Sequence, residues 1–299
     1  MPSTIPDKIV SGIQNPGEIP PYICDAIRRW YLNNIKSSNI FSESWDMLII
    51  LDACRFDLMM KIAKEYDFIS DVSSTYSVAA QSEEWMEATF RKKWDRETLN
   101  TAVITGNIYS KNAMDEEQLF YLDEVWKYAW DDSIGTVKSR PITDRAISVA
   151  REINPERLLV HYMQPHFPCV PTPRPGEGVT LDQFGSQQMT IWKKVSKGQV
   201  SVEEAKDAAL RNLRYVLNDV EILLSNVEAE KVVITADHGN AFGENGELSH
   251  PRGSVSEVIR KVPWITTTAS DEETHSPAEY NIKNTETNRE DQLRSLGYL

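Results

Sequence analysis

The chain has few cysteines, no long apolar run and no excess of basic residues. It contains only three cysteines, Cys24, Cys54 and Cys169, without the spacing of a metal or redox motif. That pattern argues against a disulfide framework and favours a reducing compartment. The first residues lack the apolar segment of a secretory signal, and no run is long enough to cross a bilayer. We therefore expect a cytoplasmic protein without a transmembrane segment.

Acidic residues outnumber basic ones. The 299 residues include 45 Asp or Glu and 32 Lys or Arg, which gives a net charge of −13. A protein of that charge repels a phosphate backbone, so we expect no nucleic-acid partner. A chain of this length can bury a sizeable core within one large α/β domain.

Strand and helix signals alternate along the chain. Short apolar runs rich in β-branched residues predict buried strands at 47–51, 100–105, 157–160 and 232–235. Apolar residues at helical spacing predict helices at 21–37, 56–66, 115–130, 143–153 and 202–227. The alternation predicts an α/β fold, a mostly parallel sheet with helices on both faces. We expect this single domain to span residues 21–266, between an irregular arm at 1–20 and a polar tail at 267–299.

Acidic and imidazole side chains follow two of the predicted strands. Asp52 comes directly after the first strand, and Asp237-His238-Gly239 follows the last. The carboxyl ends of parallel strands lie at one edge of the sheet, where ligands bind in open α/β folds. Carboxylate oxygens and imidazole nitrogens together are typical ligands of a transition metal. The sequence therefore predicts a metal site at this edge.

The histidines are concentrated in the same parts of the chain. Four of the five, His161, His166, His238 and His250, fall within two segments, 161–168 and 231–250, and only His275 lies in the polar tail. A single buried histidine is usually a hydrogen-bonded core residue. Several of them near two acids favour a metal or anion site instead.

A hydroxyl residue at a predicted helix start is the candidate nucleophile. Ser82 precedes Glu83 and Glu84, and apolar residues follow, which is typical of a helix N-terminus. The positive end of the helix dipole would also attract an anionic ester. Serine is equally favoured as an N-cap without any chemistry. The alternative nucleophiles are Ser73, Ser74, Thr75 and Ser77.

Three motifs together resemble one enzyme family. They are Asp52-x-x-Arg55-x-Asp57, His161-x-x-x-Pro165-His166-x-Pro168, and Thr235-Ala236-Asp237-His238-Gly239 followed by His250. In this order, over roughly residues 45–266, they resemble the sulfatase-like branch of the alkaline phosphatase superfamily, which includes sulfatases and phosphoglycerol transferases. The resemblance implies an alkaline-phosphatase-like domain that acts on a small anionic ester, such as a glycan or lipid head group.

The resemblance also implies roles for individual residues. Asp52, Asp237 and His238 would bind one ion that activates the hydroxyl of Ser82. His166 and His250, with or without His161, would bind a second ion or contact the substrate. The residues expected at the substrate are His161, Arg55 and Asn107. Mixed nitrogen and oxygen ligands favour Zn or Mn for the one or two divalent ions, although family members also use Ca or Mg.

Some features depart from the family pattern or allow a simpler interpretation. The chain lacks the Cys/Ser-x-Pro-x-Arg run that sulfatases convert to formylglycine, which argues against a true sulfatase. Arg55 and Asp57 could instead form an internal ion pair, and Asn107 could make a turn. We expect a metal-dependent hydrolase or transferase of phosphate or sulfate esters, with hydrolysis favoured. The alternative is a non-catalytic module of the same fold that binds anionic glycans or head groups.

Overall fold

The computed structural model describes residues 39–90, 100–115, 118–173 and 191–282, together with residues 30, 37 and 181. The expected arm at 1–20 lies outside these residues, as do nearly all of the expected helix at 21–37 and the end of the tail. Cys54 and Cys169, the two described cysteines, are buried and free.

A seven-stranded sheet forms the centre of the described fold, in the order β2-β11-β8-β1-β7-β3-β4. Five neighbouring strands are parallel: β8 (Ala229–Thr235), β1 (Met47–Leu51), β7 (Arg157–Tyr162), β3 (Thr101–Thr105) and β4 (Tyr121–Glu124). Next to β8 lies the antiparallel strand β11 (Lys261–Ala269), and β2 (Ser73–Tyr76) pairs with β11 at the edge. Every residue of β1, β3 and β7 is buried, which explains why these strands are continuous apolar runs in the sequence.

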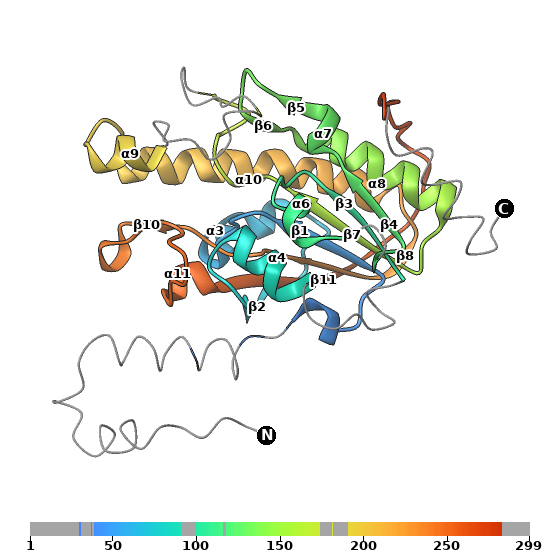
Figure 1. Cartoon of the computed structure of the whole chain (residues 1–299), viewed down its shortest axis with the longest axis horizontal. Coiled ribbons are helices and arrows are strands. Elements are labelled where there is room, and N and C mark those ends of the chain that lie inside the picture. Colours follow the sequence, from blue (N-terminus) through green and yellow to red (C-terminus); the bar gives the residue numbers. More distant parts are fainter. Residues whose placement is uncertain are drawn as a thin grey trace, which may run out of the picture.

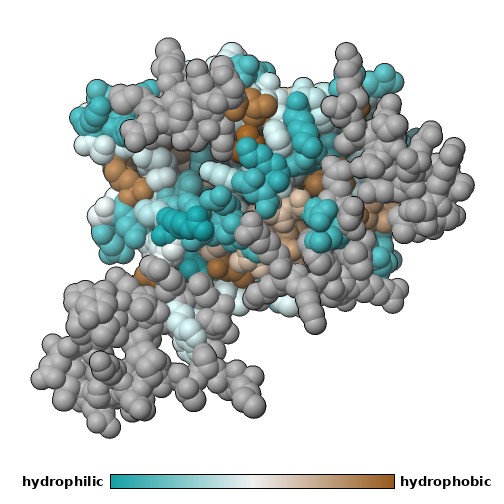
Figure 2. Space-filling view, viewed as in Figure 1, coloured by the Kyte–Doolittle hydropathy of each residue, from teal (hydrophilic) through white to brown (hydrophobic). Residues whose placement is uncertain are grey.

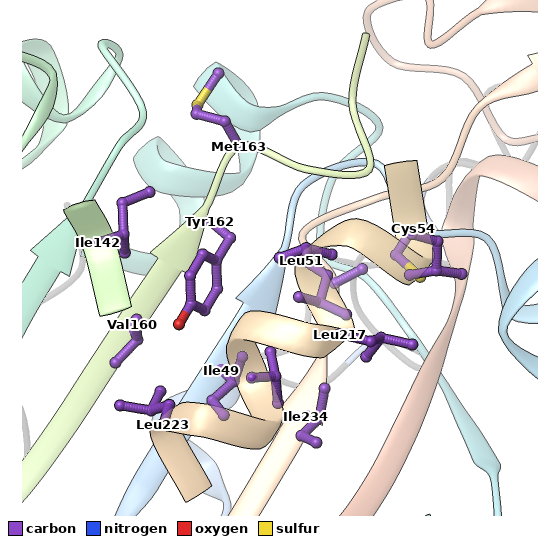
Figure 3. Close-up of a cluster of buried hydrophobic side chains, with 14 of the residues drawn as sticks. Ile49, Leu51, Cys54, Ile142, Val160, Tyr162, Met163, Leu217, Leu223 and Ile234 are labelled. Carbon is purple, nitrogen blue, oxygen red and sulfur yellow. The ribbon is translucent and has the colours of Figure 1, made fainter. Parts of the chain in front are cut away.

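Helices cover both faces of the sheet (Figure 1). One face packs against α3 (Phe56–Ile62), α8 (Ser139–Ile153) and α10 (Val202–Leu224). The other face is covered by α4 (Ser82–Phe90) and α6 (Ser110–Ala113). In Figure 3, Ile49, Val160 and Ile234 of the sheet pack with Leu217 and Leu223 of α10. The expected fold class, a mostly parallel sheet with helices on both faces, is confirmed.

Shorter elements connect these layers. They are η3 (Ile40–Ser42), η4 (Ala63–Glu65), α7 (Trp126–Ala129), β5 (Trp130–Asp131), β6 (Thr136–Val137), α9 (Ile191–Ser196), β9 (Ala241–Phe242), η7 (Glu244–Gly246), β10 (Leu248–Ser249) and α11 (Glu257–Arg260).

The prediction of a helix over residues 115–130 is wrong. Tyr121–Glu124 form the strand β4, which pairs with β3 so that Leu122 lies opposite Val103. The one α-helix within the described part of this segment is the short α7. Pairing with the backbone of β3 outweighs the helical spacing of the apolar residues, because strand preference depends on the neighbouring strand. Next to the opposite edge strand, β11 continues through Ala269, past residue 267, where the polar tail was expected to begin.

The described surface is largely hydrophilic. On the face shown in Figure 2, hydrophilic side chains surround small and separate apolar areas. Trp30 and Met60 are the exposed large apolar side chains among the described residues. None of the described helices has the length and apolar character needed to cross a membrane.

Candidate metal and nucleophile site

Three neighbouring strands bring acidic and imidazole side chains to one edge of the sheet. Asp52 follows β1, Asp237 and His238 follow β8, and His161 is the last but one residue of β7. Because β1 pairs with both β7 and β8, these ends lie side by side. All four side chains are buried, with at most 2% of their surface exposed.

The backbone after β8 is fixed by a close approach to another segment. The amide of Gly239 donates to the carbonyl of Ile259 at 2.7 Å. A Cβ atom at Gly239 would lie only 2.3 Å from the carbonyl oxygen of Val258, so this position requires glycine. The turn directs Asp237 inward, where its Oδ1 accepts hydrogen bonds from the amides of Ala53 (3.1 Å) and His238 (2.9 Å).

The hydrogen bonds of His238 define which ring nitrogen is free. Its Nδ1 lies 2.9 Å from the carbonyl oxygen of Gly239, which can only accept, so Nδ1 carries the proton. Nε2 therefore presents a lone pair. It lies 3.5 Å from Asp237 Oδ2, 3.6 Å from Asp52 Oδ1 and 3.2 Å from Ser82 Oγ.

These atoms fit a divalent metal ion. Asp52 Oδ1 and Asp237 Oδ2 are buried and have no hydrogen-bond partner, which is costly for carboxylates unless a cation binds them. Ligands in a tetrahedron with bonds of about 2.0 Å are separated by about 3.3 Å, close to the spacing around His238 Nε2. Asp52, His161 and Asp237 also offer ligand atoms within 4.8 Å of one another. Oxygen and nitrogen donors in this combination suit Zn or Mn.

The two carboxylates influence each other's protonation. Burial, together with the charge of Asp237, raises the pKa of Asp52 well above its usual value. Burial also acts to raise the pKa of Asp237, but His238 and His161 outweigh it, so that this pKa is lowered. Two like charges this close favour opposite shifts, and a bound cation would relieve the repulsion.

Ser82 is the hydroxyl residue that contacts this group. It is the first residue of α4, and its Oγ lies 3.3 Å from Asp52 Oδ2 and 3.2 Å from His238 Nε2. The alternatives lie elsewhere. Ser77 Oγ donates to the main-chain carbonyl of Asp237 and accepts from the amide of Ala79. The other three, Ser73, Ser74 and Thr75, lie in β2, where they pair with β11.

A second pair of histidines adjoins His238. His166 Nδ1 lies 2.6 Å from the carbonyl oxygen of Phe167, so it is protonated, and Nε2 accepts the hydrogen bond from His250 Nε2 at 3.1 Å. His250 Nδ1 is then an unprotonated acceptor, buried and without a partner. Burial lowers the pKa of His166 to about 4 and that of His250 well below its usual value, so both rings are neutral at pH 7. The ring centroids of His238 and His250 are 4.5 Å apart.

Two residues expected at the substrate have other partners. The guanidinium of Arg55 donates to both carboxylate oxygens of Asp57 at 2.8 Å, to Glu244 at 2.8 Å and to the carbonyl of Asn240 at 2.9 Å. Arg55 thus forms the internal ion pair that was the alternative interpretation. Asn107 both makes a turn, accepting from the amide of Tyr109, and donates to Asp52 Oδ2 at 2.9 Å, so it orients Asp52.

Two residues that support the site were missed in the sequence. Asn212 of α10 donates to the carbonyls of Pro165 (3.1 Å), His166 (2.8 Å) and Pro168 (3.2 Å), and so holds the loop that carries His166. Arg260 donates to the carbonyls of Ser77 and Ser254. The available signal for Asn212 was a polar residue within the apolar stripe of α10, between Ala209 and Leu213.

Comparisons with known proteins identify the fold. No family model and no curated protein matches the sequence. The structure is similar to lipooligosaccharide phosphoethanolamine transferase A (EptA) from Neisseria meningitidis, an integral membrane protein, with a TM-score of 0.52 and 14% identity. That alignment covers 91% of this chain and 60% of the transferase chain. The soluble domain of the same transferase gives a TM-score of 0.52 at 12% identity and covers 83% of this chain and 84% of that domain. The chain therefore has the fold of this transferase, which agrees with the resemblance of its motifs to the sulfatase-like branch of the alkaline phosphatase superfamily.

Proposed function

We propose that this protein is a metal-dependent enzyme that cleaves or transfers phosphate or sulfate esters through Ser82. The observation that carries the proposal is the position of the Ser82 hydroxyl, which lies 3.2 to 3.3 Å from His238 Nε2 and Asp52 Oδ2 in a buried group with two unpartnered carboxylate oxygens. The fold supports it, because phosphoethanolamine transferase A has the same fold and is named for transfer of a phosphoester group. That chain is longer than this one, so its substrate is not assumed.

Asp52, Asp237 and His238 would hold the ion. When bound, a divalent ion supplies positive charge that lowers the pKa of a nearby hydroxyl and compensates the charge of an ester oxygen. Asn107 fixes the Asp52 carboxylate by its hydrogen bond to Oδ2, and the amides of Ala53 and His238 fix Asp237 in the same way. Such supporting hydrogen bonds orient ligands before the ion arrives.

In the first half of the proposed reaction, Ser82 Oγ attacks the phosphorus or sulfur of the ester. Its proton has an acceptor in reach, Asp52 Oδ2; the bond to the leaving oxygen breaks as the new bond forms, and the alcohol departs with that proton. In the second half, water or an acceptor hydroxyl attacks the group on Ser82, its bond to Oγ breaks, and the proton that the incoming hydroxyl loses restores the serine hydroxyl. The neutral His250 has a free acceptor, Nδ1, that can take the proton of this incoming hydroxyl.

The proposed substrate is a small anionic ester, such as a glycan or lipid head group, and hydrolysis is the favoured outcome. Transfer differs only in which hydroxyl enters the second half of the reaction. The position of Ser82 beside Asp52 and His238 supports catalysis over the alternative of a non-catalytic binding module.

The test compares the wild-type protein with Ser82→Ala, Asp237→Ala and the control Ser74→Ala, whose hydroxyl lies in the edge strand β2. Metal content by elemental mass spectrometry and turnover of aryl phosphomonoesters, phosphodiesters and sulfates are measured. We expect Ser82→Ala to keep the metal and lose turnover by a factor on the order of 10³ or more. Asp237→Ala should lose both, and Ser74→Ala neither. Undiminished turnover in Ser82→Ala would contradict the proposal, and metal binding without turnover of any ester would favour the binding module.

A further inference from the structure

His161 is a fully buried imidazole to which the proposed reaction gives no part. It lies near the end of the interior strand β7, opposite Ile50 of β1 and Thr105 of β3. None of its side-chain surface is exposed, and neither ring nitrogen has a hydrogen-bond partner. Such a group is rare, because its lost hydration is not replaced. The ring packs edge-to-face against Trp85 at 5.8 Å, on the face of the sheet that α4 covers.

The surroundings of His161 point to a ligand that is itself buried. Its Nε2 lies 3.9 Å from Asp237 Oδ2, which is too far for a hydrogen bond. Asp237 Oδ2 also has no hydrogen-bond partner. With metal bonds of about 2.1 Å, two ligands 3.9 Å apart subtend an angle of roughly 135° at the ion, which is wider than in a tetrahedron and fits a five-coordinate ion.

We propose that His161 is a ligand of the metal ion, so that Asp52, His161, Asp237 and His238 bind it together from three adjacent strands. The inference rests on the proposed metal site and assigns His161 to the ion in place of the substrate. His161 reaches the ion from β7, and Ser82 lies at the start of α4. An ion with these four ligands can take a fifth, and that position would be left to the ester.

This ligand set has a consequence for metal choice. Two imidazoles and two carboxylates favour transition metals such as Zn²⁺, Co²⁺ or Mn²⁺ over Mg²⁺ and Ca²⁺, which prefer oxygen ligands. With His161 removed, two carboxylates and one imidazole remain, and the preference for transition metals weakens. The selectivity between Zn²⁺ and Mg²⁺ thus reports on His161 independently of catalysis.

The experiment uses metal-free wild-type protein, His161→Gln and a matched control, His275→Gln. His275 lies in the segment after β11, is partly exposed, and contacts Asp144 of α8. Binding of Co²⁺ and Zn²⁺ is measured by competition with a chelator, and the coordination of Co²⁺ by its visible absorption. We expect His161→Gln to weaken both affinities at least about tenfold and to change the Co²⁺ spectrum, and His275→Gln to change neither. Wild-type affinity together with a wild-type spectrum in His161→Gln overturns the inference.

A second measurement does not depend on the stability of the variant. Wild-type protein with ¹⁵N-labelled histidine is loaded with one equivalent of ¹¹³Cd²⁺, and the ring nitrogens coupled to cadmium are counted by NMR. Coupling of cadmium to two imidazoles in the wild-type protein supports the inference, and coupling to only one overturns it. A folded His161 variant, where one exists, assigns the resonance, because the signal of His161 is missing from its spectrum. Neither experiment uses turnover, so failure of the enzymatic proposal and failure of this assignment are distinguishable. A wild-type protein that binds none of these ions overturns both.

Discussion

Two groups of buried carboxylates in this protein differ in how their charge is compensated. Asp123 of β4 is almost fully buried, and both of its oxygens have donors: Tyr128 at 2.7 Å and the guanidinium of Arg145 at 2.6 Å. Asp52 and Asp237 are equally buried, yet each has one oxygen without a partner, and each has the other as a like-charged neighbour.

The difference separates a structural group from a functional one. Burial alone does not identify a site, since Asp123 is as deep as Asp52. The informative property is a buried charge that the protein leaves uncompensated, because folding does not retain such a cost without a ligand to remove it. The same reasoning applies to His161 and to Nδ1 of His250, which also lack partners.

The largest expected effect concerns the compensated group. Asp123→Asn leaves Arg145 buried without its counter-ion, and breaking a buried ion pair in this way costs about 3–5 kcal/mol. We expect the free energy of unfolding, measured by urea denaturation, to fall by this amount. The double variant Asp123→Asn with Arg145→Met is the control, since removing both charges should recover part of the loss. A single variant as stable as wild type would show that Asp123 is not the counter-ion.

The next effect concerns pH and arises in two buried histidines near the uncompensated carboxylates. Burial lowers the pKa of His161 and His166 to about 4, below the value of about 6.5 in an unfolded chain. Histidines with a depressed pKa contribute stability that is present above pH 6.5 and is lost as the pH falls toward 4. At pH 5 each would remove about 2 kcal/mol from the metal-free protein. The raised pKa of Asp52 acts in the opposite sense, because its contribution grows as the pH falls, and it offsets part of this loss.

The measurement is urea denaturation of the chelator-treated protein at pH 7.5 and pH 5. His166→Gln should show a shallower dependence than wild type, because one of the titrating groups is gone. The compensated group should not contribute. Although burial disfavours its charge, Asp123 raises the pKa of Arg145, which stays charged throughout this range. Equal stability of the wild-type protein at the two pH values would contradict the neutral, buried state of these histidines.

The sequence predicts the centre of the sheet better than its edges. The runs of β1, β3, β7 and β8 are recognisable because helices cover both faces, which leaves little room for polar residues. The strand β4 is not recognisable in the sequence, because its polar residues Asp123 and Glu124 are also typical of the exposed side of a helix. At the other edge, β2 is partly exposed and made of hydroxyl residues and one tyrosine, a composition that carries no apolar pattern.

The candidate site follows the same division. Convergence of Asp52, Asp237 and His238 is predictable, because each follows an apolar run and parallel strands share one edge. The side-chain contacts within the site are not predictable, because they join segments that are far apart in the sequence and that only the folded structure brings together. His166 and His250 are 84 residues apart, and the partner Glu244 of Arg55 is 189 residues away from it.

The smallest expected effect is an increase in the free energy of unfolding, from replacing Asp52 by Asn, the same type of substitution as Asp123→Asn. In Asp52→Asn, the amide oxygen can keep the hydrogen bonds from Asn107 and Ser82, and the amide nitrogen takes the place of the unpartnered Oδ1, 3.6 Å from the lone pair of His238 Nε2. The variant loses a like-charge repulsion with Asp237. We expect the free energy of unfolding of metal-free Asp52→Asn to be about 1–2 kcal/mol higher than that of wild type, and its metal affinity to be lower.

The measurement is urea denaturation of both proteins, first with chelator and then with Zn²⁺. The order of stability should reverse when Zn²⁺ is added, because the ion stabilises only the protein that binds it. If Asp52→Asn destabilised the metal-free protein as Asp123→Asn does, the two groups of carboxylates would be alike, and the case for a metal at Asp52 would lose its physical basis.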